Sequence, residues 1–175
     1  MEAIGGLYES HAAAVHRYAL RRSDRDTADE VTAQVFLVAW RRRSEVPEDA
    51  LPWLYGVARR ALADQRRGAS RRNKLGQRLR SAAIEEPVEL VSHDRRLTDA
   101  LRRLSAGDRE VLLLCHWEEL EPAQMARVMG CSRAAAAVRL HRARRRLARQ
   151  LELEGATRAG GEEQRHACAG STESL

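Results

Sequence analysis

Aromatic residues and cysteines are scarce in this chain. Its 175 residues include one Phe, three Tyr and three Trp, and the apolar remainder is mostly Ala, Leu and Val, which favours helix over sheet. The three cysteines, Cys115, Cys131 and Cys168, are odd in number and lack CxxC spacing, which argues against a disulfide framework and a structural zinc site. We therefore expect an all-α protein with reduced thiols, no metal and no cofactor.

Long apolar runs are also missing. No run approaches the roughly 18–20 residues that span a bilayer, and the first residues lack the cationic and hydrophobic segments of a signal peptide. These absences predict a cytoplasmic protein with no membrane insertion.

Positive charge is plentiful and clustered. Lys and Arg number 31 against 25 Asp and Glu, which gives a net charge of +6 and a pI near 10.0. Arginine on helix surfaces can simply keep a protein in solution, so net charge alone identifies no partner. Residues 56–80, however, hold nine basic residues and one acid, and residues 122–151 hold eight Arg and no acid. Two separate cationic blocks indicate nucleic acid as the partner.

Hydrophobic periodicity predicts three helices in the first part of the chain. Apolar residues recur at helical spacing from Leu7 to Ala19, and a second helix is predicted from Thr27 to Arg42, with Thr27 and Glu30 in the spacing of a capping box. Pro47 and Pro52 then require a loop, and a third helix follows from Trp53 to about residue 68.

The sequence therefore predicts two small helical modules, at residues 1–70 and 95–151. Residues 71–94 are rich in Arg, contain Ser, Gly and Pro, and have only scattered apolar residues, so we expect a flexible linker that lets the modules move independently. Residues 152–175 have almost no large apolar residue and are predicted to be a disordered tail.

The second module contains the pattern of a helix-turn-helix. A short helix is predicted from Pro122 to Met129, followed by a turn at Gly130 and a second helix from Arg133, with Ser132 as its N-cap. Met125, Ala126 and Met129 are expected to pack against Val138 and Leu140. A plain helical hairpin with a solvated arginine face is the alternative, but seven arginines and no acid between residues 133 and 149 repel one another unless an anion neutralises them.

In both modules, and in order, the chain resembles the extracytoplasmic function class of sigma factors, the subunits that direct bacterial RNA polymerase to promoters. The segments that carry the resemblance are ADEVTAQVFLVAWRR, LPWLYGVARRALADQRR, LSAGDREVLLLCHWEEL and RLHRARRRL. They lie within about residues 4–70 and 95–151.

The resemblance implies core RNA polymerase, promoter DNA and an anti-sigma factor as partners. It assigns core binding to the second predicted helix, where the matching polar positions are Asp29, Glu30 and Gln34.

It also assigns recognition of the minus-ten element to the following loop and helix. The matching residues are Arg41, Arg42, Arg43, Ser44, Glu45, Trp53, Arg59, Arg60 and Asp64. An unpaired base needs stacking surfaces and a cationic flank. Trp40 and Trp53 flank the loop, but their apolar register favours core positions for both. Arg60 stands where the family usually has Asn, which leaves base preference open.

The helix-turn-helix corresponds to the part of the family that recognises the minus-thirty-five element. The matching residues are Ser132, Arg133, Ala135, Ala136, Arg139, Arg142 and Arg146. Because residues 134–137 are alanines where the family usually has polar side chains, we expect base readout to depend on Arg133 and Arg139.

The sequence leaves two other functions to consider. A stand-alone helix-turn-helix regulator would need a ligand or dimerisation domain in the first module, where no pocket or heptad pattern is evident. An enzyme would need a catalytic pair, and only Cys115 beside His116 is a candidate. Adjacent residues on a helix point about 100° apart, so these two do not face each other as nucleophile and base. We therefore predict a protein without enzymatic activity.

Overall fold

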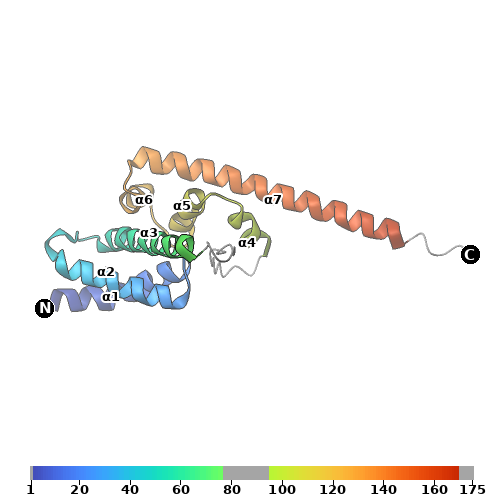
Figure 1. Cartoon of the computed structure of the whole chain (residues 1–175). Coiled ribbons are helices and arrows are strands. Elements are labelled where there is room, and N and C mark those ends of the chain that lie inside the picture. The colour runs from blue at the N-terminus through green and yellow to red at the C-terminus, as the bar shows by residue number, and fades with distance from the viewer. Residues whose placement is uncertain (1, 77–94, 170–175) are drawn as a thin grey trace, which may run out of the picture.

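The computed structural model describes residues 2–76 and 95–169, with side chains for residues 5–68 and 95–153. The described residues form helices and no strand, which confirms the all-α class (Figure 1). The first module contains α1 (Glu2–Leu20), α2 (Arg25–Arg41), the short 3-10 helix η1 (Arg43–Glu45) and α3 (Ala50–Gly76). The second module contains α4 (Arg95–Arg102), α5 (Ala106–His116), α6 (Pro122–Met129) and α7 (Arg133–Ala169).

The start of α2 differs from the sequence prediction. Asp24 is the N-cap, and its carboxylate accepts hydrogen bonds from the backbone N–H of Thr27 at 2.8 Å and from the Thr27 hydroxyl at 3.0 Å. These bonds lower the pKa of Asp24. The predicted capping box of Thr27 with Glu30 is therefore wrong, because Thr27 already lies inside the first turn.

The helix-turn-helix is confirmed at α6 and α7. Pro122 is in the first turn of α6, and Gly130 ends it in the left-handed conformation, at φ 64° and ψ 41°, which glycine adopts without strain. The Ser132 hydroxyl caps α7 by accepting the N–H of Ala135 at 3.1 Å. A capping box between Glu121 and Gln124, which the sequence analysis missed, completes the start of α6.

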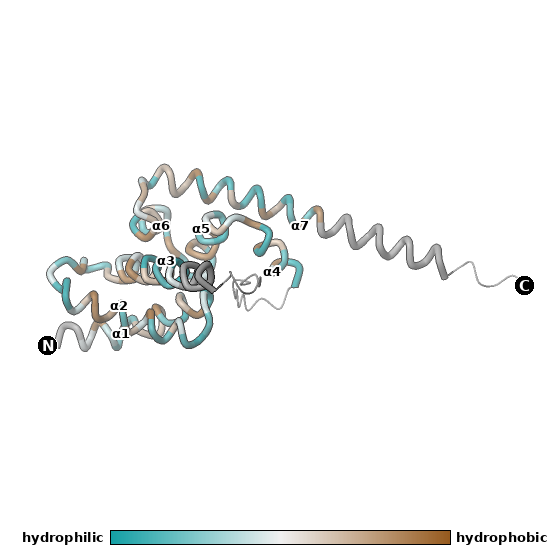
Figure 2. The backbone as a smooth tube through the Cα atoms, in the orientation of Figure 1, coloured by the Kyte–Doolittle hydropathy of each residue, from teal (hydrophilic) through white to brown (hydrophobic). Residues whose placement is uncertain are grey.

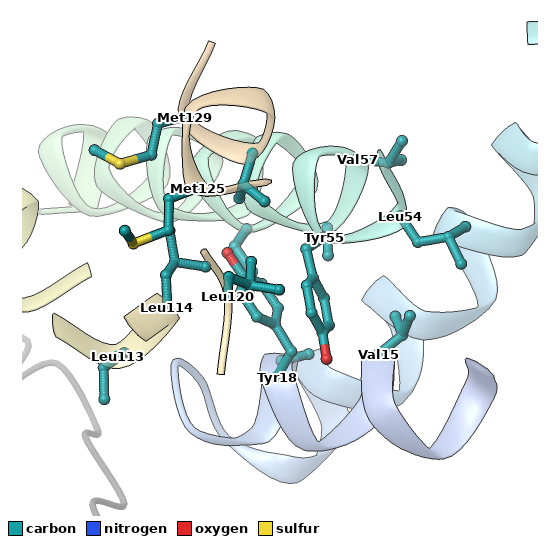
Figure 3. Packing of buried hydrophobic residues seen from close by; sticks show 14 of the residues in the cluster. Val15, Tyr18, Leu54, Tyr55, Val57, Leu113, Leu114, Leu120, Met125 and Met129 are labelled. Atoms are coloured by element: carbon teal, nitrogen blue, oxygen red, sulfur yellow. The ribbon is translucent and has the colours of Figure 1, made fainter. Parts of the chain in front are cut away.

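The two modules share one hydrophobic core, contrary to the expectation that they move independently. Tyr18 of α1 stacks on Tyr55 of α3 with ring centroids 4.7 Å apart, and Figure 3 shows Leu120 of the second module beside this pair. Figure 2 shows hydrophobic stretches on α3, α5 and α6, the elements that lie where the modules meet. A module of about 60 residues buries too little apolar surface to be more than marginally stable, which explains why the two combine their cores.

Two helices extend beyond their predicted ends. The third helix continues to Gly76, into the predicted linker, and residues 77–94 lie outside the described part of the chain. Helix α7 continues to Ala169 and projects away from the body of the molecule (Figure 1). Residues 152–169 were predicted to be disordered. They contain no proline, and their four Ala and four Glu, which have high helix propensity, outnumber their three Gly. Residues 170–175 are not described.

Candidate functional site

A buried ionic cluster joins the modules; we call Tyr18, Arg21, Arg22, Glu110 and Glu118 the Arg22 cluster. Arg22 is 6% exposed, and its Nε donates to Glu110 Oε2 at 2.8 Å while its Nη1 donates to Glu118 Oε1 at 3.1 Å. Arg21 Nη2 donates to Glu118 Oε2 at 2.5 Å, and the Tyr18 hydroxyl donates to Glu110 Oε1 at 2.8 Å. Within the described part of the chain, Arg22 Nη2 is buried without a hydrogen-bond partner.

Protonation in the cluster follows from burial and charge. Burial by itself would raise the pKa of Glu110, but the charge and hydrogen bond of Arg22, with the hydrogen bond from Tyr18, hold that pKa below its ordinary value. Burial and the nearby Glu110 carboxylate raise the pKa of Tyr18 well above 10.0, so its hydroxyl remains a donor. Both effects keep the cluster as an ionised carboxylate accepting from a neutral phenol and a guanidinium. The sequence analysis missed this cluster because its members lie far apart in the chain.

Contacts between α3 and α6 complete the module interface. Asp49, just before α3, accepts hydrogen bonds from Gln124 Nε2 at 3.3 Å and from Arg127, and these bonds lower the pKa of Asp49. A Cβ atom placed on Gly56 would lie 3.7 Å from the Cα of Val128, so the backbones of α3 and α6 approach closely at this glycine.

The predicted core-binding residues fall on two different surfaces. Glu30 and Gln34 line a groove of about 540 Å³ between α2 and α3, together with Leu37 and Asp64. Asp29 points instead toward α1, where its carboxylate lies 2.9 Å from His16 Nε2. The structure thus brings Glu30 and Gln34 together but separates Asp29 from them. Asp64, predicted to contact DNA, lies in this groove.

The loop between α2 and α3 gathers most of the predicted minus-ten residues. Arg41, Arg42, Arg43, Ser44 and Glu45 are all exposed. Arg42 Nε donates to Glu45 Oε1 at 3.0 Å, and its guanidinium lies 5.8 Å from the ring centroid of Trp53.

Of the two tryptophans beside this loop, Trp53 is half-buried and packs on the core, as expected. Trp40 is 54% exposed, so the expectation that it belongs to the core is wrong. Trp40 lies on the last turn of α2, next to the exposed Arg41, and offers an exposed aromatic surface that the sequence did not predict.

Arg59 and Arg60 lie farther along α3, near the module interface rather than the loop. The charge of Arg59 helps to lower the pKa of Glu110, which places it near the Arg22 cluster. Arg60 Nη1 would lie 3.8 Å from a Cβ on Gly56, beside the contact with α6.

The recognition helix, the first turns of α7, differs from the prediction at two apolar positions. Ala136 is fully buried with Leu140 and Ala143 against the rest of the second module, so its predicted contact with DNA is wrong. Val138 is 48% exposed, so it does not pack against α6 as expected. Because the alanine run lacks contrast in hydrophobicity, periodicity alone could not set the phase of this helix.

The other residues of α7 that were predicted to contact DNA differ in their solvent exposure. Arg133, Arg139 and Arg142 are exposed, whereas Ala135 is half-buried. The hydroxyl of Ser132 accepts a backbone hydrogen bond as the helix cap.

Arg146 has a protein partner. Its Nη1 donates to Asp108 Oδ2 at 2.5 Å, and the same carboxylate oxygen accepts a hydrogen bond from the Ser105 hydroxyl at 2.8 Å. Arg146 thus helps to hold α7 against α5, a role that its position in the arginine-rich segment did not suggest.

The described residues offer no further catalytic or metal-binding group. Cys115 is half-buried, with Arg144 Nη2 3.4 Å from its Sγ, and the side chain of His116 is exposed. In residues 5–68 and 95–153, no group of three or more His, Cys, Asp or Glu side chains is placed to hold a metal ion. No described helix is both long and apolar enough to cross a bilayer.

Known proteins match the chain in both modules. Residues 7–72 match the family model for Sigma-70 region 2, and residues 94–147 match the model for Sigma-70, region 4. The chain is 37% identical over 160 residues to the ECF RNA polymerase sigma factor SigL of Mycobacterium tuberculosis, which covers 87% of this chain and 90% of that protein. It is 32% identical over 160 residues to the ECF RNA polymerase sigma factor BldN of Streptomyces coelicolor, which covers 86% of this chain and 61% of that protein.

Among solved structures, the sigma factor RpoE in complex with the anti-sigma factor NepR, from Bartonella quintana, has a similar fold. The TM-score is 0.67 at 23% identity, over 87% of this chain and 98% of that chain.

Proposed function

The chain belongs to the extracytoplasmic function sigma factors. On that premise we propose which of its residues bind core polymerase and which bind each promoter element. Sigma factors are transcription initiation factors without enzymatic activity, which bind core RNA polymerase and direct it to promoter DNA. The observation that carries the assignment is the 37% identity to SigL over 90% of that protein. Because RNA polymerase works in the cytoplasm, we place this protein there.

Core polymerase is proposed to bind at the groove between α2 and α3. Glu30, Gln34, Leu37 and Asp64 combine exposed apolar surface with two carboxylates, which suits a basic amphipathic helix. Replacing Glu30 by Arg should weaken capture of purified core polymerase, since it reverses a charge in the groove.

The matched control is Asp29→Arg, because Asp29 neighbours Glu30 in sequence but faces α1. Circular dichroism would verify that both variants are folded. Equal losses for the two variants, or none, would contradict the placement of the core-binding surface in the groove.

The minus-ten element is proposed to bind at the loop between α2 and α3. Exposed cations at Arg41 and Arg43 supply charge for the phosphates. The exposed ring of Trp40 and the outer part of the half-buried Trp53 supply aromatic surface for stacking. Arg59 and Arg60 add positive charge farther along α3, toward the module interface.

The minus-thirty-five element is proposed to bind at α7 through Arg133, Arg139 and Arg142, which are exposed on the recognition helix. Arg146 contributes chiefly by holding this helix to Asp108.

Binding both elements at once requires the modules to separate. Helix α6 contacts both α3 and α7. Packed helices lie about 8–10 Å apart, so the two DNA-contacting helices are within roughly 20 Å of each other. The two promoter elements are about 25 base pairs apart, which is roughly 85 Å at about 3.4 Å per base pair. We infer that the described arrangement is a resting state that opens on the promoter.

An anti-sigma factor is proposed as a further partner. The sigma factor RpoE of Bartonella quintana, which shares the fold, was solved in complex with one. A protein that abolishes promoter-specific initiation when added to this chain would identify the partner.

Run-off transcription with purified core polymerase and genomic promoter fragments tests the function as a whole. Specific initiation is expected only when this chain is added. Promoter binding without polymerase, and no gain of initiation with it, would instead support a stand-alone regulator.

A further inference from the structure

The recognition helix exposes one branched apolar side chain, Val138, on its outer surface. Successive residues of an α-helix are rotated by about 100°, so Ala136, Leu140 and Ala143 form one stripe, and this stripe is buried against α5 and α6. On the opposite stripe lie Ala134 and Val138, both exposed, and Val138 is nearly diametrically opposed to Ala136. The outermost point of the first turns of α7 is therefore a branched apolar side chain.

The structure of the protein alone gives no reason for a valine at this position. A β-branched residue has lower helix propensity than alanine, and Val138 is 48% exposed, so packing recovers little of that cost. Alanines occupy the preceding positions of the same exposed surface, at Ala134 and Ala137.

The surroundings of Val138 are cationic. Arg139 follows it directly, Arg142 lies one turn farther along nearly the same stripe, and both are exposed. No acidic residue occurs from 122 to 151. An apolar point flanked by arginines on a recognition helix matches the major groove of duplex DNA, where phosphates line the rim and the thymine 5-methyl group is the apolar feature of the base edges.

We propose that Val138 recognises promoter DNA by contact with the 5-methyl group of thymine in the minus-thirty-five element. Ala134 provides room for the base edge beside it, because its methyl side chain is short. Arg139 and Arg142 hold the helix in the groove through phosphates or guanine. This proposal rests on the proposed function of α7, and it assigns base preference to a residue that carries no hydrogen-bonding group.

The test removes only the methyl group. Holoenzyme assembled from this chain and core polymerase selects minus-thirty-five duplexes from a randomised pool, and the selected duplex is then synthesised with thymine or with deoxyuridine in the same positions. Base pairing is retained, so the two duplexes differ only in methyl groups in the major groove. Loss of one buried methyl contact should weaken binding about fourfold, equivalent to about 0.8 kcal/mol.

Two variants of the full chain distinguish a methyl contact made by Val138 from the general affinity for DNA. Val138→Ala should bind both duplexes with equal affinity, because it removes the side chain that contacts the methyl group. Arg139→Ala should weaken binding to both duplexes and keep the fourfold difference between them. Val138 is exposed, so circular dichroism should be unchanged in its variant.

Each result decides for or against the proposal. Equal affinity of the unaltered chain for the two duplexes would overturn it while leaving the function of α7 intact. A thymine preference that persists in Val138→Ala would assign the contact to another residue, and a selected sequence without A·T pairs would also overturn it. If no duplex is selected at all, the proposed function of α7 fails together with this inference.

Discussion

Replacing Glu118 by Ala should destabilise the whole protein through the Arg22 cluster. The Glu118 side chain is 2% exposed and pairs with Arg21 at 2.5 Å and with Arg22 at 3.1 Å. Breaking a buried ion pair by removing one partner costs about 3–5 kcal/mol, because the remaining charge stays buried. Arg22 keeps Glu110 and Arg21 can reach water, so we expect a loss of about 3 kcal/mol, a large part of a typical total of about 5–15 kcal/mol.

Urea unfolding measured by circular dichroism and by tryptophan fluorescence tests this expectation. At a typical slope of about 1–3 kcal/mol per molar urea, the midpoint should fall by about 1–3 M. Trp53 lies in the first module and Trp117 in the second, so one cooperative unit should give coincident transitions. Combining Glu118→Ala with Arg22→Met should cost at least about 1 kcal/mol less than the sum of the single changes.

Glu9→Ala is the matched control, because Glu9 is exposed on α1 and its replacement should change stability by no more than about 0.5 kcal/mol. If Glu118→Ala behaves like this control and shows no coupling to Arg22, the modules are not joined in solution by the Arg22 cluster.

Three further predictions concern single positions. Asp24→Ala removes the cap of α2 and should lower the free energy of unfolding by about 1 kcal/mol, measured in urea, whereas an unchanged value would refute the capping role. The depressed pKa of Glu110 stabilises the fold above the ordinary glutamate pKa of about 4.3, and this stabilisation should be lost as pH falls through the lower folded value. As pH falls through this acidic range, the melting temperature should therefore decrease less steeply for Glu110→Gln than for the unaltered chain. An equal dependence of the two melting temperatures on pH would count against an ionised Glu110. Gly130→Val forces a branched residue to φ 64° and should cost about 1–2 kcal/mol in thermal unfolding, more than Gly130→Asn, since Asn tolerates this conformation.

Local signals in the sequence were sufficient for the helix-turn-helix. Pro122, Gly130 and Ser132 each act on the backbone within a turn or two of their own position, so α6 and the start of α7 could be placed to the residue. The same kind of signal misled at α2, because Thr27 and Glu30 have capping-box spacing while Asp24 supplies the acceptor.

Three features depend on tertiary packing and could not be predicted from local sequence. The run from Ala134 to Ala137 has no contrast in hydrophobicity, so only packing against α5 and α6 determines that Ala136 is buried and Val138 exposed. The pairing of Arg22 with Glu110 joins residues 88 positions apart, and nothing in the charge pattern around either residue indicates it. For the same reason, the separation of Asp29 from Glu30 could not be predicted from the polar match alone.

The Arg22 cluster also limits how such a protein can be rebuilt by exchange of parts. Grafting residues 95–151 onto a first module that lacks Arg21 and Arg22 would bury Glu110 and Glu118 without the charges that neutralise them here. A chimera of that kind must carry Tyr18, Arg21 and Arg22 with it. The outer stripe of α7, from Ala134 to Arg142, is exposed and lies apart from the cluster, so exchanging this short stripe alone is the route to altered promoter choice that leaves the fold unchanged.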